Sequence, residues 1–293
     1  MISKERKIWS FAGNLVGFIL SFLAVMPFIL LLIASFTDDK TAITYGYTYF
    51  PKKWSLDAYK YIWNESATIF RAYGVTIFVT VAGTLLSLLI TAMLACMLSK
   101  EDLPGQRIFS FLLVFTMLFS GGLVPTYIVY SNYFHIKDTI FALIVPGMLM
   151  NAFNVILVRN FFTNSIPKEL KESARLDGAG EMRVLFQIVL PLSTPIMATI
   201  GLMTALGYWN NWQNGLYYLT DTKLYTIQNI LNDINTSVQF LATNSVQGVR
   251  FGDIPSTTVR MAIAVIGVLP MIIAYPFFQK YFVKGLTLGG VKG

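Results

Sequence analysis

Two stretches of the sequence place polar, charged or aromatic side chains at spacings that could do chemistry. The first, Ser165–Gly180, reads SIPKELKESARLDGAG and is typical of a short charged helix that ends at a glycine. The second, Tyr208–Asn214, reads YWNNWQN and interleaves amides with aromatic rings. A short polar helix is suited to docking another protein. Amides and rings together are suited to sugars, because amides bond hydroxyls and rings pack against C–H faces.

The amino-acid sequence gives little indication of a catalytic role. His135 is the one histidine and Cys96 the one cysteine, so a Cys/His zinc site and an intramolecular disulfide are both excluded. No phosphate-binding G-x-x-x-x-G-K-[ST] loop is present. We therefore expect no catalytic residue, no metal site and no cofactor bound by this chain, and no ATP hydrolysis of its own.

The composition indicates an integral membrane protein. Of the 293 residues, 55% are hydrophobic and 13% are charged, and the mean hydropathy is +0.60. Soluble domains are about one-quarter charged, and disorder requires low hydrophobicity. The net charge of +7 would suit a nucleic-acid binder, but in so apolar a chain Lys and Arg more often set membrane orientation. We expect no nucleic-acid partner.

Six charge-poor stretches are long enough to cross a bilayer as helices, which needs about 20 apolar residues. The first is too long for the apolar part of a cleaved signal peptide, about 7–15 residues, so we expect it to stay as a helix. None has the short alternating pattern of an outer-membrane barrel strand. The predicted spans are Phe11–Phe36, Ala72–Leu98, Ile108–Tyr130, Thr139–Val158, Val184–Trp209 and Met261–Gln279, the last starting a few residues earlier, near Thr257.

Basic residues divide unevenly between the two sides that six spans define. Thirteen of the 22 Lys and Arg fall on the side of the termini, five of them between Arg159 and Arg183. Because cytoplasmic loops are enriched in Lys and Arg, we expect that side to be cytoplasmic. The expected organisation is a cytoplasmic N-terminus 1–10, a first span 11–36, an external loop 37–71, a five-helix core 72–283 that includes a cytoplasmic docking helix 166–178 and an external loop 211–256, and a cytoplasmic tail 284–293.

Two local sequence patterns add a bend and a further helix to the predicted arrangement of six spans. Pro191 and Pro195 each remove an intrahelical donor, so together they predict a bend in the fifth span. In the second external loop, Ile227, Ile230, Leu231 and Ile234 recur at helical spacing and predict an amphipathic helix.

The Ser165–Gly180 segment carries the signals of a separately capped helix. Pro167 is placed for the first helical position, and Glu169 for the first turn, where the helix dipole favours an acid. Leu170, Ala174 and Asp177 share one face, and Gly178 can end the helix in the left-handed conformation. Spacing alone fits a docking helix and a solvated connector equally well.

The residue types favour docking. The run Glu172–Gly178 followed by Ile188–Pro191 resembles the Glu-Ala-Ala signature of the membrane subunits of importer-type ABC transporters. Ser173 stands where the family has its first Ala. The matching positions are Glu172, Ala174, Gly178, Ile188, Leu190 and Pro191.

Further segments resemble one branch of that family. Asp177–Ala179 is similar to the carbohydrate-uptake, maltose-permease-like branch. The tail Gly285–Gly293 and the pair Trp209-Asn210 are similar to its second membrane subunit. Phe119–Tyr127 resembles a subgroup that handles complex oligosaccharides. The resemblance covers essentially the whole chain.

The resemblance implies an all-α integral membrane protein with the type I ABC importer permease fold, in the cytoplasmic membrane of a prokaryote. It implies a heterodimer with a second homologous permease, two copies of a cytoplasmic ATPase that uses ATP and Mg²⁺, an external sugar-binding protein that meets the loop 211–256, and the lipid bilayer as partners. The implied ATPase contacts are Glu169, Glu172, Ser173, Ala174, Arg175, Leu176, Asp177, Gly178 and Ala179 in the helix and Gly289, Gly290 and Lys292 in the tail.

Six residues are candidates for contact with a sugar in the pathway. Each has a structural alternative: the aromatic belt at the membrane surface for the rings and nearby amides, and interhelical hydrogen bonds for amides within a span. The candidates are Asn151, Asn154, Tyr208, Trp209, Asn210 and Asn211.

Two other classes of membrane protein remain as alternatives. A secondary transporter or channel would be expected to have ionisable residues within the spans, and inverted repeats or broken helices. A membrane enzyme would need a catalytic cluster. The predicted spans contain no ionisable residue near their centres, no catalytic cluster and no convincing repeat, which favours an ATP-driven importer of a hydroxyl-rich substrate.

Overall fold

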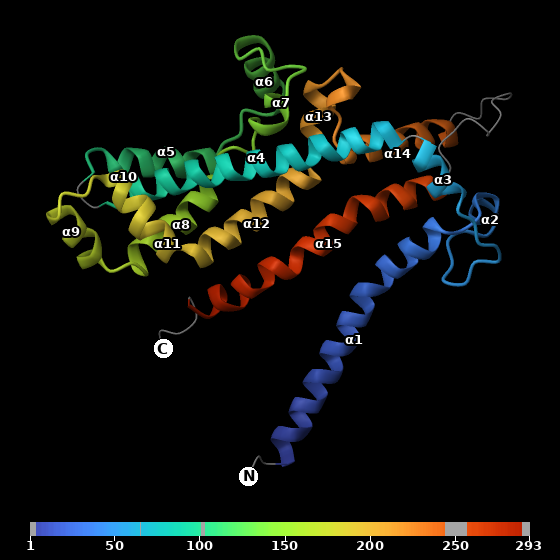
Figure 1. The fold of residues 1–293 in the computed structure, drawn as a ribbon, viewed down its shortest axis with the longest axis horizontal. Helices are drawn as coiled ribbons and strands as arrows, with labels where there is room; N and C mark the ends of the chain where they lie inside the picture. The colour runs from blue at the N-terminus through green and yellow to red at the C-terminus, as the bar shows by residue number, and fades with distance from the viewer. Residues whose placement is uncertain (1–3, 65, 101–102, 244–256, 289–293) are drawn as a thin grey trace. The chain divides into compact units, whose positions relative to one another are not determined.

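The computed structural model describes residues 4–64, 66–100, 103–243 and 257–288 (Figure 1). In these ranges the chain is helical, without a strand, and Thr37 and Trp54 form an isolated antiparallel bridge. The all-α prediction is confirmed. The longer helices are α1 (Lys4–Ser35), α4 (Ser66–Leu98), α5 (Gln106–Leu118), α8 (Ala152–Asn164), α12 (Thr194–Asn210), α14 (Ile227–Thr243) and α15 (Thr257–Leu288). The shorter ones are α2 (Asp39–Tyr45), α3 (Asp57–Asn64), α6 (Leu123–Ile128), η1 (Val129–Tyr133), α7 (Phe141–Ile144), α9 (Lys168–Leu176), α10 (Glu181–Val184), η2 (Leu185–Val189), α11 (Leu190–Leu192), α13 (Gln213–Tyr218) and η3 (Thr222–Leu224).

Three of the predicted spans are continuous helices. The described part of the chain contains three helical segments long and apolar enough to cross a membrane: Trp9–Ser35, Ser66–Leu98 and Thr257–Pro276. They correspond to the first, second and sixth predictions. In the described ranges the last helix is α15, Thr257–Leu288, and the predicted amphipathic helix is present as α14.

The third and fifth predicted spans are bent. The helices Gln106–Leu118 and Leu123–Tyr133 meet at 115°, and Glu181–Leu192 and Thr194–Asn210 meet at 85°. The second bend lies at Ser193, between the two prolines, and confirms the predicted one. The hydroxyl of Ser193 donates to the carbonyl of Val189 at 2.7 Å, which stabilises the last turn before the break.

The fourth predicted span, Thr139–Val158, is wrong as a single helix. The chain leaves α7 at Pro146 and Gly147, where Gly147 has φ +69°, and starts α8 only at Ala152. α8 has 13 residues, about 20 Å at 1.5 Å per residue, against a hydrocarbon core of about 30 Å. By length and composition the described helices supply three spans, or five if each bent pair is one span, against the six predicted.

The chain forms two compact units, Met1–Ile69 with Leu231–Pro270, and Phe70–Ile230 with Met271–Gly293. The core of the second unit joins α4, α5, α8 and α10–α12. A further cluster in this unit packs α7 against α12 and α13. The core residues include Ala95, Leu98, Leu113, Val155, Val158, Phe162, Val184, Val189 and Ile200, and the further cluster includes Val79, Leu143, Ile144, Tyr208, Tyr218 and Leu219.

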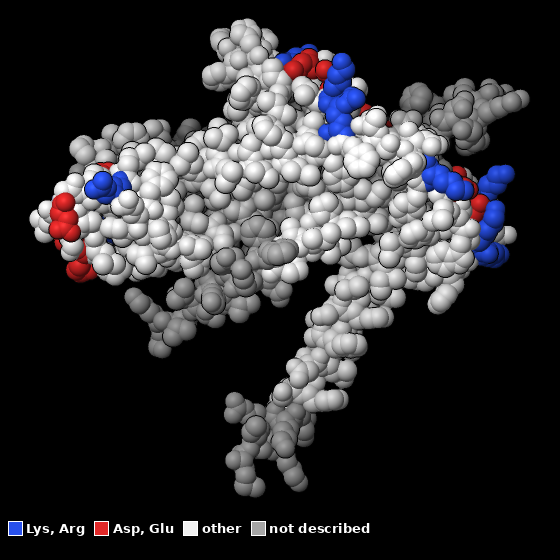
Figure 2. Space-filling model, viewed as in Figure 1, with Lys and Arg blue, Asp and Glu red and all other residues white. Residues whose placement is uncertain are grey.

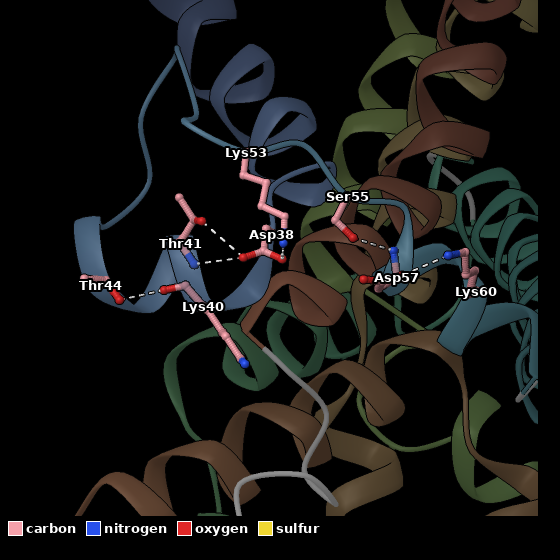
Figure 3. A network of polar contacts seen from close by, with 8 residues as sticks. All are labelled: Asp38, Lys40, Thr41, Thr44, Lys53, Ser55, Asp57 and Lys60. Atoms are coloured by element: carbon pink, nitrogen blue, oxygen red, sulfur yellow. Dashed lines mark hydrogen bonds and ion pairs between the residues drawn. The ribbon is translucent and has the colours of Figure 1, made fainter.

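In the first unit, the segment predicted as the external loop 37–71 has local structure of its own (Figure 3). The Asp38 carboxylate caps α2 by accepting from the N–H and the hydroxyl of Thr41, and it pairs with Lys53 at 3.1 Å. The Lys53 hydrogen bond is the main reason that the pKa of Asp38 lies below its usual value. Asp57 and Lys60 form a second, exposed pair at 3.0 Å. This loop is therefore a folded element.

In the second unit, Asp138 fastens the turn before α7 to the end of α13. Asp138 has φ +55°. Its carboxylate accepts hydrogen bonds from the Thr220 N–H, from the Thr220 hydroxyl at 2.7 Å and from the Asp221 N–H at 3.1 Å. The backbone N–H of Thr220 is the main cause of a pKa below the usual value for Asp138. The charged form is therefore the one that holds the two segments together.

We expect Asp138→Asn to make the stability of the folded protein less dependent on pH under acidic conditions. A carboxyl whose pKa is lower in the folded than in the unfolded chain, where it is about 3.9, stabilises the fold above that pH, and the contribution disappears as the pH falls through the folded pKa. Thermal unfolding of the detergent-purified protein between pH 7 and pH 3 tests this. The variant should be less stable at pH 7 and lose less stability on acidification. Asn tolerates the same left-handed backbone, so an acid response identical to that of the unsubstituted protein would contradict the assignment.

Candidate docking helix and candidate substrate contacts

α9 is capped as the sequence indicates, with one shift at its start. Pro167 precedes the first helical residue, Lys168, because its ψ of 133° is extended. At the other end Gly178 has φ +80°. The Gly178 N–H donates to the Arg175 carbonyl at 3.0 Å and the Ala179 N–H to the Ala174 carbonyl at 2.9 Å, which is the Schellman pattern of a glycine-terminated helix. The helix is thus Lys168–Leu176, two residues shorter at each end than the predicted 166–178.

The two faces of α9 differ sharply. Towards the core, Ala174 and Ala179 pack on the hydrophobic cluster, and Ile166 before the helix is buried. On the opposite face, the Leu176 side chain is 89% exposed. Its neighbours at helical spacing, and the residues of the C-terminal turn, are exposed as well: Glu169, Glu172, Ser173, Asp177 and Gly178. An apolar side chain ringed by acids and small residues is a surface suited to a partner protein.

Charged contacts hold α9 to the rest of the second unit. The Lys171 ammonium donates to the Phe162 carbonyl at 3.0 Å, in the last turn of α8, where carbonyls lack intrahelical partners. Burial lowers the pKa of Lys171. The Glu181 carboxylate pairs with Arg175 of α9 at 3.0 Å and with Lys100 after α4 at 2.9 Å. A displacement of α9 would therefore be transmitted through these contacts to α4, α8 and α10.

These contacts surround a pocket of about 280 Å³ beneath α9, lined among others by Cys96, Ser99, Lys168, Glu172 and Val189. Figure 2 places charged side chains at the end of the second unit that carries α9, while the visible surface over the middle of α4 is uncharged. The charged end is the one expected to lie outside the bilayer.

We expect Glu181→Gln to loosen α9 without unfolding the protein. The change removes two ion pairs, in which the side chains of Glu181, Arg175 and Lys100 are 25–49% exposed. Such pairs contribute about 0–1 kcal/mol each to the stability of the fold. In a reconstituted complex, the ratio of substrate transported to ATP hydrolysed should fall, with little change in melting temperature. Asp57→Asn, which removes the exposed Asp57–Lys60 pair, is the matched control and should change neither. Equal ratios in both variants would rule out a role for Glu181 in holding α9.

The two aromatic candidates for substrate contact are buried in the packing of the chain. Tyr208 is 1% exposed, and its hydroxyl donates to the Ile144 carbonyl at 2.9 Å. Its ring lies against Gly83. Trp209 is 5% exposed, with its ring 6.5 Å from that of Tyr73. In this conformation both residues join helices.

The amide candidates lie nearer the surface. Asn151 is exposed and caps α8, where its side-chain oxygen accepts from the Asn154 N–H at 3.1 Å. The exposed Asn210 donates to the Leu206 carbonyl at 2.9 Å, and the Asn211 oxygen accepts from the Asn214 N–H at 3.0 Å. Asn210 and Asn211 therefore lie together at the end of α12, whereas Asn151 and Asn154 lie together at the start of α8. The tail candidates Gly289, Gly290 and Lys292 lie outside the described residues.

Two buried asparagines that were not among the six candidates hold the segment after α12 in place. Asn214 donates to the Pro146 carbonyl at 3.0 Å. Asn229 donates to the Trp212 carbonyl at 2.7 Å and accepts from the Thr226 hydroxyl. A methyl group at Gly215 would overlap the Asn229 amide. The abundance of Asn in this loop was the available signal, but it does not tell which amides are buried. In the described ranges, no group of three His, Cys, Asp or Glu could hold a metal ion.

Comparison with known proteins gives consistent matches along the chain. The family model for binding-protein-dependent transport system inner membrane components matches residues 2–288. The polygalacturonan/rhamnogalacturonan transport system permease protein of Bacillus subtilis is 40% identical over 279 residues, covering 94% of this chain and 96% of that protein. An arabinooligosaccharides transport system permease protein of Halalkalibacterium halodurans is 30% identical over 287 residues, covering 95% of each. A bacterial ABC transporter involved in import of the acidic polysaccharide alginate has a chain of similar structure, with TM-score 0.78, 30% identity and coverage of 96% of this chain and 99% of that one.

Proposed function

Because this chain belongs to the family of binding-protein-dependent transport system inner membrane components, we propose that it is the membrane-spanning subunit of an ATP-driven importer of oligosaccharides. The observation that carries the proposal is the family match over residues 2–288, which includes every described helix. Relatives whose names specify polygalacturonan, rhamnogalacturonan and arabinooligosaccharides supply the substrate class. The chain itself would hydrolyse no ATP.

The assembly that follows has this chain paired with a second, homologous permease in the cytoplasmic membrane. Two copies of a cytoplasmic ATPase, which use ATP and Mg²⁺, and an external sugar-binding protein complete it. We place both termini and α9 in the cytoplasm, because thirteen of the 22 basic residues lie on that side of a six-span arrangement. The fourth span would then use the broken segment that contains α7 and α8.

α9 would be the element through which the ATPase moves the membrane helices. Its exposed face, centred on Leu176, is free to enter a cleft of the ATPase. Closure of the ATPase would displace α9, and the Lys171–Phe162 contact and the Arg175–Glu181–Lys100 pairs would carry the displacement into α8, α10 and α4. These contacts lie at the end of the second unit that is expected outside the bilayer, so they would transmit force without a charge inside the bilayer.

Reconstitution tests the proposal. The permease, its homologous partner, the ATPase and the binding protein are placed in proteoliposomes, and ATP hydrolysis is measured with neutral and uronic-acid oligosaccharides presented by the binding protein. We expect hydrolysis and uptake to rise together with at least one of these sugars. A complex that takes up sugar without ATP, or that responds to no oligosaccharide that its binding protein holds, would overturn the assignment.

A further inference from the structure

The lining of the pocket beneath α9 carries an excess of positive charge. Three of its cations, Lys168, Lys171 and Arg175, follow one another at spacings of three and four residues, so they share one face of α9. Lys100, which follows α4, is a fourth cation in the lining, and two carboxylates accompany the four. The excess is therefore two positive charges among the charged lining residues Lys100, Lys168, Lys171, Glu172, Arg175 and Glu181.

Lys171 is the lining cation that lacks a negatively charged partner. The Glu181 carboxylate pairs with Lys100 at 2.9 Å and with Arg175 at 3.0 Å. The Lys171 ammonium instead donates to the Phe162 carbonyl at 3.0 Å, and it forms no ion pair within the described ranges. Burial is the main cause that lowers the pKa of Lys171, and the neighbouring cations of α9 lower it further. Because an ammonium has three N–H donors, two remain for an anion in the pocket.

The size and the position of the pocket fit a small phosphate-bearing group. Its volume of about 280 Å³ lies just below the usual range for ligand pockets, about 300–1,000 Å³, so it suits one headgroup or ion and is too small for a nucleotide. A phosphate monoester carries a charge of about −1.5 to −2 at pH 7, close to the excess of two in the lining. The lining comes from α9 and from the ends of α4 and α8, where the chain is expected to leave the bilayer. Basic pockets at that level bind the headgroups of anionic lipids.

We propose that the pocket beneath α9 binds a phosphate group, held by Lys171 together with Lys168 and Lys100, and that the bound group ties α9 to the end of α4. The phosphate belongs either to the headgroup of an anionic lipid or to a free phosphate ion, because both present the same oxygens to the cations. Since α9 is the proposed docking element, the bound group would set how firmly that element is held to the membrane helices. Binding itself does not depend on the proposed function.

Cys96 is a built-in reporter, because it is the single cysteine of the sequence and it lines this pocket. The complete complex, without nucleotide, is placed in nanodiscs of phosphatidylcholine, of phosphatidylcholine with phosphatidylglycerol, or of phosphatidylcholine with added inorganic phosphate, with chloride keeping the ionic strength equal. The rate at which uncharged N-ethylmaleimide modifies the permease is followed by its intact mass. We expect phosphatidylglycerol or inorganic phosphate, at saturation, to slow the reaction at least about tenfold, and the one that does so identifies the source. If Cys96 reacts too slowly to measure, Ser99→Cys in a Cys96→Ala background reports on the same pocket. Equal rates in all three conditions would overturn the proposal.

Charge variants separate a specific site from a general attraction of anions to a basic surface. Lys171→Gln removes the cation but keeps an N–H donor for the Phe162 carbonyl, and it should weaken the affinity behind the protection at least about tenfold. Lys171→Arg keeps the charge and should keep the protection. Arg183→Gln removes one positive charge from the exposed part of α10, outside the pocket lining, and is the matched control. Equal losses of protection in Lys171→Gln and Arg183→Gln would overturn the pocket as the binding site. These measurements need no sugar, so a complex that failed to transport would overturn the proposed function and leave this result standing.

Discussion

Leu176→Lys is expected to abolish sugar uptake by releasing the ATPase, while the permease itself stays folded. Leu176 is 89% exposed, so its substitution removes little buried surface from the chain. A cation at the last residue of a helix is also favoured by the helix dipole, so α9 should remain intact. In the complex, however, the same side chain would bring a charge into the contact with the ATPase. Loss of a central apolar contact costs at least about 2 kcal/mol in protein interfaces, about thirtyfold in affinity.

Co-purification from detergent-solubilised membranes measures this effect. The amount of ATPase bound per permease is compared for the unsubstituted chain, Leu176→Lys and Leu176→Met, which keeps an apolar side chain of similar volume. Leu56→Lys is the control for an added charge, because Leu56 is also exposed but lies in the first unit, on a segment expected outside the cell. Only Leu176→Lys should lose the ATPase. If it retained the ATPase at the level of Leu176→Met, α9 would not be the docking element.

For α9, the sequence was sufficient to predict the residues that stabilise its two ends. Glu169 in the first turn and Gly178 at the end act within one or two turns of the chain, so residue type and spacing suffice to place them. The same reasoning located the bend between Pro191 and Pro195, because a missing N–H acts on the preceding turn. It failed by one residue at Pro167, whose extended ψ ends the preceding segment and does not begin the helix.

The sequence predictions were wrong where the structure depends on distant parts of the chain, or on properties of a segment other than its lack of charge. Absence of charge made Thr139–Val158 a candidate span, but that property does not require a continuous helix, and Pro146 and Gly147 interrupt it. Asn151 looked like an amide between helices, yet it caps α8. Tyr208 looked equally suited to the membrane surface and to a sugar. Its partner, the Ile144 carbonyl, lies 64 residues away in the sequence, where spacing gives no information.

Gly83→Ala is expected to destabilise the permease, although the same substitution in an open helix stabilises by about 1 kcal/mol. A methyl group at this position would lie 2.5–2.8 Å from three atoms of the Tyr208 ring. The ring has little room to withdraw, because Tyr208 is 1% exposed and its hydroxyl is held by the Ile144 carbonyl. Overpacking of this kind costs about 1–3 kcal/mol. We therefore expect a lower melting temperature and less permease in the membrane.

A second glycine in the same helix supplies the control. Gly74 has no atom within 4 Å of a methyl group at its position, so Gly74→Ala should be neutral or slightly stabilising. The double variant Gly83→Ala, Tyr208→Leu removes the ring that the methyl group would meet. Its melting temperature should lie above the value obtained by adding the two single effects, because the overlap is shared between the two positions. Additive losses, or equal melting temperatures for Gly74→Ala and Gly83→Ala, would mean that α4 and α12 do not pack at this point.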